Sequence, residues 1–185
     1  MRAYLLRHGE SAHNANIAAE PLADELGDRL TPNGVEQARA AAAGLTGLGV
    51  TRLLTSPMRR ATETADAVGA AIGLEAEELP YVHELGLESF EQGVARVRRL
   101  KAELEGAPAG ERPLIVTHGI FIRFFLLDSM LGDEFAPRMA GRIWHLHSHN
   151  CGLSTFEPGP ARDPAGGKTP GWACFGWMER PWARS

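Results

Sequence analysis

AYLLRHGES, residues 3–11, is a short apolar run followed directly by Arg-His-Gly. PLIVTHG, residues 113–119, repeats this arrangement, because its apolar run ends in Thr-His-Gly. A third run, Val50 to Thr55, is followed by the polar stretch Ser56 to Arg60. Short apolar runs bounded by polar or turn-forming residues are typical of buried strands. The sequence therefore predicts three strands, each with a polar cluster at its end.

Helix signals lie between these runs. Thr31-Pro32 and Ser56-Pro57 each supply an N-cap residue and a proline suited to the first helical position. We expect helices over residues 32 to about 47, 57–72, 88–105 and 120–131, and a last strand over Gly152 to Phe156. Residues 157–171 are rich in Pro and Gly and are expected to form a surface loop.

Alternating strands and helices predict an α/β fold with three layers, in which helices cover both faces of a mostly parallel sheet. Ligands of such sheets bind beyond the carboxyl ends of the strands. The three polar clusters should therefore share one edge of the sheet. His8, His118 and at least two arginines would meet there.

Length and composition limit the classes of function. A chain of 185 residues with 44% apolar and 23% charged residues is expected to form one globular domain over residues 1–185. Nineteen basic and 23 acidic residues give a net charge of −4, which argues against nucleic-acid binding through a broad basic face and against a polybasic membrane anchor. A homodimer is compatible with the sequence.

The expected location is the cytoplasm. The strongest candidate for a membrane span, Ile120 to Leu131, is short and contains Arg123 and Asp128. Cys151 and Cys174 form neither a C-x-x-C motif nor a disulfide framework, which favours a reducing compartment.

Two arginines, two histidines and helix N-termini would form a site for a doubly charged tetrahedral oxyanion such as a phosphoryl group. A neutral histidine aimed at phosphorus can act as a nucleophile and split the displacement into two steps. Surrounding cations would stabilise the charge on the equatorial oxygens, so this chemistry requires no metal and no cofactor. The leaving oxygen needs a proton from a nearby acid.

Three motifs in order resemble those of the histidine phosphatase superfamily, also called phosphoglycerate mutase-like: LRHGES (6–11) with Asn14, SPMRRATETA (56–65) and VTHG (116–119). LTPNG (30–34) is similar to the first-helix signature of that family, and Asn150-Cys151 with the strand that follows is similar to its last-strand motif. The resemblance runs from about residue 1 to 156. It implies a phosphoglycerate mutase-like fold and phosphoryl-transfer chemistry.

The resemblance also implies a role for each matching residue. His8 would be the phosphorylated nucleophile, and Glu84, in VHELG, stands where the general acid of the family lies. The phosphate pocket would be completed by Arg7, Arg60 and His118. Further phosphate or substrate contacts would come from Gly9, Ser11, Asn14 and Gly119.

The acid has alternatives. Glu88 follows Glu84 almost at once, where the next helix is expected to begin, so the segment that covers the pocket is short. Glu84 is the acid, Glu88 replaces it, or the chain lacks one. Loss of the acid would matter less for a phosphoramidate, whose protonated nitrogen is a better leaving group.

Other polar residues compete for places in the site. Neighbouring helical residues point about 100° apart, so only one of Arg59 and Arg60 can point inward, and the resemblance selects Arg60. Arg59 is then a solvated or rim residue. For Arg123 we favour a structural ion pair over a phosphate contact. His13 is left open as a residue of the substrate mouth.

His145, His147 and His149 alternate, so a strand would place all three on one face, where they could bind a metal ion. The stretch has no clear carboxylate partner, and we favour pocket-wall or exposed positions instead. Four aromatic residues near the C-terminus are expected to pack within an edge segment: Trp172, Phe175, Trp177 and Trp182.

The sequence therefore predicts a metal-independent phosphatase that hydrolyses a small-molecule phosphomonoester through a phosphohistidine. A phosphomutase of the phosphoglycerate mutase type and a protein phosphohistidine phosphatase are the alternatives within the enzyme class. A phosphate-binding module without catalytic activity is the alternative outside it.

Overall fold

A six-stranded sheet forms the centre of the computed structural model, which describes residues 1–15, 28–86, 88–162 and 166–183. The strands are β1 (Ala3–Arg7), β2 (Arg52–Thr55), β3 (Ala76–Glu78), β4 (Pro113–Thr117), β5 (Leu153–Pro158) and β8 (Trp172–Glu179). Their order is β3-β2-β4-β1-β5-β8. The first four strands in this order are parallel, and β5 and β8 join antiparallel. The expected α/β class with a mostly parallel sheet is confirmed.

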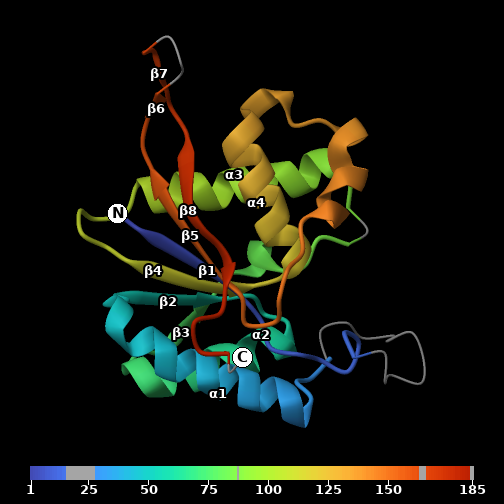
Figure 1. Cartoon of the computed structure of the whole chain (residues 1–185), viewed down its shortest axis with the longest axis vertical. Coiled ribbons are helices and arrows are strands. Elements are labelled where there is room, and N and C mark those ends of the chain that lie inside the picture. Colours follow the sequence, from blue (N-terminus) through green and yellow to red (C-terminus); the bar gives the residue numbers. More distant parts are fainter. Residues whose placement is uncertain (16–27, 87, 163–165, 184–185) are drawn as a thin grey trace.

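Helices cover both faces of the sheet, as expected (Figure 1). Helices α1 (Pro32–Leu45) and α2 (Arg59–Ile72) pack on one face, and α3 (Phe90–Glu105) and α4 (Gly119–Leu131) pack on the other. The alternation of side chains along a strand produces this division. Leu5 is buried in the core beneath α3 and α4, whereas its neighbour Leu6 is buried in the core beneath α1 and α2.

Capping residues define where two of the helices begin. Thr31 is the N-cap of α1, and its hydroxyl accepts a hydrogen bond from Gly34 N at 2.9 Å. Ser89 and Gln92 form a capping box at the start of α3. This helix therefore begins at Phe90, two residues later than predicted. Gly73, with φ of +75°, ends α2 where the sequence predicts.

The predicted start of α2 at Ser56-Pro57 is wrong. The helix begins at Arg59, with Met58 as its N-cap. Ser56 stays in a turn after β2, because its hydroxyl accepts a hydrogen bond from Met58 N (3.2 Å) and also contacts His118 Nε2 (2.7 Å). Its oxygen therefore contacts the residue that follows β4 and does not cap the helix.

Residues 157–171 do not form the irregular loop that we expected. This segment begins inside β5 and contains a short ribbon, β6 (Ala161–Arg162) with β7 (Lys168–Thr169), which extends beyond the sheet (Figure 1). At its base, Trp172 packs edge-on against Phe125, with ring centroids 5.3 Å apart. Trp172 therefore packs as expected for an aromatic edge segment, whereas Phe175 is exposed.

Short 3₁₀ segments make up much of the remaining structure: η2 (Thr46–Leu48), η3 (Pro80–Val82), η4 (Gly132–Glu134) and η5 (Pro137–His145). The strand hypothesised for residues 145–149 is wrong, because His145 ends η5 and the following residues are irregular. Within the described ranges, no helix has both the length and the apolarity that crossing a bilayer requires.

Candidate active site

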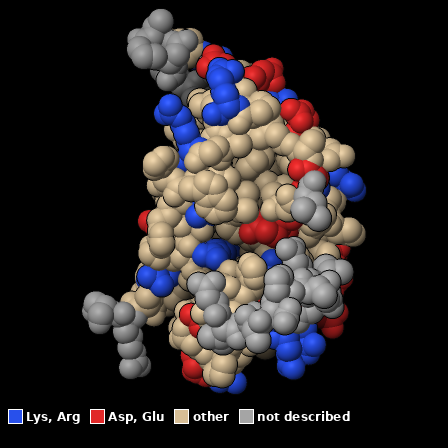
Figure 2. All heavy atoms as spheres, turned by 90° about the vertical axis from the view of Figure 1, so that its right-hand side faces the viewer, with Lys and Arg blue, Asp and Glu red and all other residues tan. Residues whose placement is uncertain are grey.

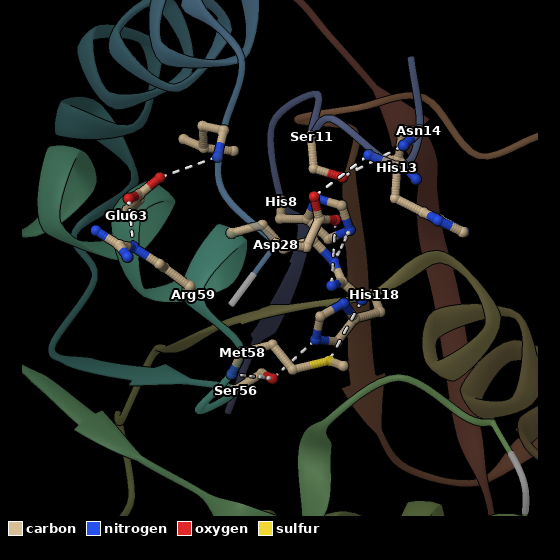
Figure 3. A network of polar contacts seen from close by, with 12 residues as sticks. His8, Ser11, His13, Asn14, Asp28, Ser56, Met58, Arg59, Glu63 and His118 are labelled. Atoms are coloured by element: carbon tan, nitrogen blue, oxygen red, sulfur yellow. Dashed lines mark hydrogen bonds and ion pairs between the residues drawn. The ribbon is translucent and has the colours of Figure 1, made fainter. Parts of the chain in front are cut away.

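The ends of β1 and β4 bring the two predicted histidines together. These strands are parallel neighbours, with Arg7 opposite Thr117 in their register. The next residue of each strand is a histidine, and the ring centroids of His8 and His118 lie 5.0 Å apart (Figure 3). Both side chains are buried. The strand-end argument from sequence therefore places both imidazoles correctly.

His8 is held in one tautomer. Its Nδ1 lies 2.6 Å from the carbonyl oxygen of Gly9, which can only accept, so Nδ1 carries the proton. Its Nε2 then accepts a hydrogen bond from Arg60 Nε at 3.2 Å. Burial, together with the charges of Arg60 and Arg7, holds the pKa of His8 well below its ordinary value. His8 is thus a neutral imidazole with a lone pair on Nε2.

His118 is neutral for similar reasons. Burial lowers its pKa well below the ordinary value, and His8 and Arg60 add to the effect. Its Nε2 lies 2.7 Å from Ser56 Oγ, and when the Ser56 hydroxyl donates to this nitrogen, Nδ1 carries the ring proton. This Nδ1 is buried and has no hydrogen-bond partner within the described residues.

The two neighbouring arginines at the start of α2 point in different directions. Arg60 is buried, contacts His8 and pairs with Asp28, whose Oδ2 lies 3.4 Å from Nη1. Arg59 is turned toward solvent, where it pairs with Glu63 at 3.0 Å (Figure 3). This is the division expected from the angle between adjacent helical residues.

The side chain of Arg7, the last residue of β1, lies at the same edge of the sheet. Its Nη1 donates to the carbonyl oxygen of Ser148, and its Nη2 donates to Asn14 Oδ1 at 3.3 Å. Its Nε is buried without a hydrogen-bond partner in the described part of the chain. Burial lowers the pKa of Arg7, and the guanidinium groups of Arg123 and Arg60 add to that effect against the opposing charge of Glu84. A site with this concentration of positive charge favours an anionic ligand.

Gly9 and Ser11, which were predicted as phosphate contacts, each hold a neighbouring site residue in place. The Gly9 carbonyl orients His8, and a Cβ at this position would lie 2.6 Å from the Gly34 carbonyl oxygen, so a glycine is required. Ser11 is fully buried, and its hydroxyl accepts from Asn14 N at 3.4 Å. Ser11 therefore supports the turn that carries Asn14 and does not itself line the cavity described below.

Glu84 reaches the site, and Glu88 does not. Glu84 Oε1 accepts from the backbone N–H groups of Ile120 and Phe121 at 3.2 Å each, at the start of α4. Burial raises the pKa of Glu84, although these donors and Arg60 oppose the shift. For Glu88, burial is outweighed by the backbone N–H of Gly86 and by the ion pair with Arg96, so its pKa is lowered.

A cavity of about 490 Å³ opens at this edge of the sheet. Its floor, as we define it, consists of Arg7, His8, Arg60 and Glu84. Its wall, as we define it, consists of His13, Asn14, Arg123, Trp144 and His147. Gly119 lies between them, where a Cβ would come within 2.8 Å of Ser148 Oγ and 3.3 Å of Arg7 Nε. Figure 2 shows basic and acidic side chains meeting near the middle of this face.

The expected ion pair of Arg123 is wrong. Arg123 Nε donates to the carbonyl oxygen of Leu146 at 2.7 Å, and its guanidinium lies 5.3 Å from the ring centroid of Trp144. Within the described residues it has no carboxylate in ion-pairing distance. Its head group lines the cavity, although the sequence favoured a structural ion pair over a phosphate contact.

Sequence reasoning also missed Asp28, which is buried against Arg60 and accepts from His13 N at 3.2 Å. The sequence indicated this role only weakly, since Asp28 is simply an acidic residue shortly before the Thr31-Pro32 helix start. Of the alternating histidines, His147 lines the cavity and stacks edge-on against His149, with centroids 4.3 Å apart. Across the described residues, no three His, Cys, Asp or Glu side chains group as a metal site would require.

A family model and curated relatives each match most of the chain. A family model described as histidine phosphatase superfamily (branch 1) matches residues 3–87 and 79–163. "Probable phosphoglycerate mutase GpmB" of Serratia proteamaculans is 30% identical over 191 residues, which cover 85% of each protein. The protein of the same name from Yersinia enterocolitica is 28% identical over the same shares.

Solved structures share the fold at lower identity. A mutant phosphoserine phosphatase of Entamoeba histolytica, in complex with phosphoserine, has a TM-score of 0.74 at 18% identity and covers 98% of both chains. The mycobacterial glucosyl-3-phosphoglycerate phosphatase has a TM-score of 0.73 at 21% identity, over 97% of this chain and 99% of its own. These similarities establish the three-layer architecture.

Proposed function

Since this chain belongs to the histidine phosphatase superfamily, we propose that it hydrolyses small-molecule phosphomonoesters through a phosphohistidine formed on His8. The observation that carries this proposal is the state of His8: neutral, protonated on Nδ1 toward the Gly9 carbonyl, with Nε2 beside Arg60. A buried imidazole fixed in this way is prepared to attack phosphorus without first losing a proton.

In the first step, Nε2 of His8 attacks phosphorus while the bond from phosphorus to the alcohol oxygen breaks. Arg7 and Arg60 stabilise the charge on the equatorial oxygens, and the unpartnered Nδ1 of His118 is the donor that this ring offers. Glu84 gives its proton to the departing alcohol. Its raised pKa suits this role, because more of the carboxyl stays protonated above its ordinary range.

In the second step, the Glu84 carboxylate takes a proton from water as the water oxygen attacks phosphorus. The bond from phosphorus to Nε2 breaks, inorganic phosphate leaves, and both His8 and Glu84 return to their starting states. Guanidinium groups supply the positive charge throughout, so the proposed mechanism uses no metal ion and no organic cofactor.

A phosphomutase is the second candidate, because the curated relatives at 28–30% identity are named probable phosphoglycerate mutases. A mutase would return the phosphoryl group from His8 to a second oxygen of the same metabolite. The two candidates differ in the fate of label: a mutase exchanges it between substrate positions faster than it releases phosphate.

A panel of phosphomonoesters, assayed with the wild type and with His8→Ala, tests the proposal. We expect phosphate release by the wild type and none above background by His8→Ala, with no faster exchange of label between positions. Turnover that survives His8→Ala would overturn the nucleophile. Failure of the wild type to release phosphate even from para-nitrophenyl phosphate, whose leaving group hardly needs an acid, would support a binding module instead.

A further inference from the structure

Trp144 places an exposed indole on the cavity wall. Three large apolar side chains in the described part of the chain are strongly exposed, and Trp144 is one of them, at 64%. The other two, Met130 and Phe175, do not line this cavity. A single exposed apolar side chain needs no explanation by itself, but Trp144 lines a cavity, and aromatic side chains are typical of the lining of ligand pockets.

Arg123 fixes the indole from one side. Its guanidinium carbon lies 5.3 Å from the ring centroid of Trp144, and its Nε is tied to the Leu146 carbonyl at 2.7 Å. Ile143, next to Trp144, is buried in the core and anchors the end of η5. A cation thus lies over one face of the indole, and the side chain, 64% exposed, also lines the cavity.

The size of the cavity exceeds the needs of a phosphoryl group. Its volume of about 490 Å³ falls in the range of about 300–1,000 Å³ typical of pockets for drug-sized ligands. The phosphoryl group would lie on the floor at His8, so the organic part of the substrate extends along the wall. Leu85 and Ile120 add apolar surface there.

We infer that the alcohol part of the substrate carries a flat aromatic or heteroaromatic ring, which stacks on Trp144 while the phosphoryl group lies at His8. This assignment rests on the proposed function and makes Trp144 a specificity-determining residue. Stacking of a nucleic-acid base on an aromatic side chain strengthens binding by roughly tenfold or more for each ring, and we expect a similar gain for a substrate ring on Trp144.

Two primary alkyl phosphates of similar leaving group test the assignment: phenethyl phosphate, which carries a ring, and propyl phosphate, which does not. We expect the wild type to prefer phenethyl phosphate by about tenfold in kcat/KM. Trp144→Ala should lose that preference, because KM should rise about tenfold more for phenethyl phosphate than for propyl phosphate, and Trp144→Phe should keep most of it. Met130→Ala, an equally exposed apolar residue outside the cavity, is the matched control.

Binding of both compounds to His8→Ala, measured by calorimetry with and without Trp144→Ala, separates this assignment from the proposed function, because it needs no turnover. Weaker binding of phenethyl phosphate alone supports stacking. Equal loss for both compounds, or no loss for either, overturns stacking whether or not the enzyme is a phosphatase. Turnover that is insensitive to His8→Ala overturns the phosphatase mechanism and leaves the binding result to decide the role of Trp144.

Discussion

The floor and the wall of the cavity are built in different ways. The floor lies at the ends of packed parallel strands and at the start of α2, and His8 and Arg60 are buried there. The wall comes from the end of η5 and the irregular stretch after it, from the turn at His13 and from one head group on α4, and Trp144 and His147 are exposed. The sheet thus fixes the phosphoryl chemistry, while segments outside it form the surface that meets the rest of the substrate.

Burial affects the charges of both regions. It lowers the pKa values of His8 and Arg7 on the floor and of Arg123 on the wall, so cationic charge is costly there until an anion arrives. Arg123 is also held by a carbonyl oxygen and an indole face. Because every substrate shares the phosphoryl group, substitutions on the floor should affect every substrate alike, and substitutions on the wall should affect substrates selectively.

The largest effect should come from removing the nucleophile. His8→Ala should lower kcat by about 10⁴-fold or more for every phosphomonoester, because no other group on the floor can form the covalent intermediate. His147→Ala, an imidazole of the wall, is the matched control and should change kcat by less than about threefold. Steady-state phosphate release measures both. Similar losses in the two variants would remove the distinction between floor and wall.

The neighbouring arginines of α2 provide the next comparison. Arg60→Ala should lower kcat/KM by roughly 10²- to 10³-fold, because it removes a buried charge that contacts His8 and would face the phosphoryl oxygens. Arg59→Ala should stay within about twofold, since its exposed ion pair with Glu63 contributes little. Circular dichroism checks that both variants fold. A larger loss of kcat/KM in Arg59→Ala than in Arg60→Ala would contradict the assignment of Arg60 to the site.

The two glutamates give a smaller and substrate-dependent effect. Glu84→Gln should lower kcat/KM for alkyl phosphates by about 10²-fold, but for para-nitrophenyl phosphate by only a few fold, because that leaving group needs little protonation. Glu88→Gln, which alters contacts with Arg96 and with the Gly86 N–H outside the cavity, should affect both substrates alike.

The pH profile sharpens this test. The pKa of Glu84 is raised, and only the protonated form donates, so wild-type kcat/KM on alkyl phosphates should fall as pH rises through that pKa. Glu84→Gln should lack this limb. A wild-type profile that rises monotonically above pH ~8 would contradict Glu84 as the acid.

The smallest effect concerns stability. The pKa values of His8 and His118 are lowered by burial, so the unfolded state binds more protons below pH ~6.5. As the pH is lowered below that point, the free energy of unfolding should therefore decrease, by up to about 1.4 kcal/mol per pH unit for each histidine. Urea unfolding at several pH values should show a flatter slope for the double variant His8→Asn/His118→Asn.

The meeting of His8 and His118 could be predicted from the sequence because strand ends are local signals. Apolar runs that stop at Arg-His-Gly and Thr-His-Gly, together with the rule for parallel sheets, suffice to bring His8 and His118 together. The choice of Arg60 over Arg59 likewise follows from helix geometry and the family spacing.

Part of the wall could be predicted: Asn14 was expected as a contact, and a pocket-wall position was one of those favoured for the alternating histidines, of which His147 lines the cavity. The contacts of Arg123 could not be predicted, because they join residues through irregular segments. Arg123 meets the Leu146 carbonyl only because η5 turns the chain back over α4, and alternation at residues 145–149 suggested a strand that does not form. The start of α2 was misplaced because Ser56 hydrogen-bonds to His118, a contact across 62 residues that no local pattern contains.

The stereochemical course at phosphorus tests the central claim most directly. A phosphomonoester made chiral at phosphorus with oxygen isotopes and sulfur is hydrolysed in isotopically labelled water, and the configuration of the product is read by phosphorus NMR. Two successive in-line displacements, first by His8 and then by water, predict net retention. Net inversion would mean that water attacks the substrate directly, and His8 would then not be the nucleophile.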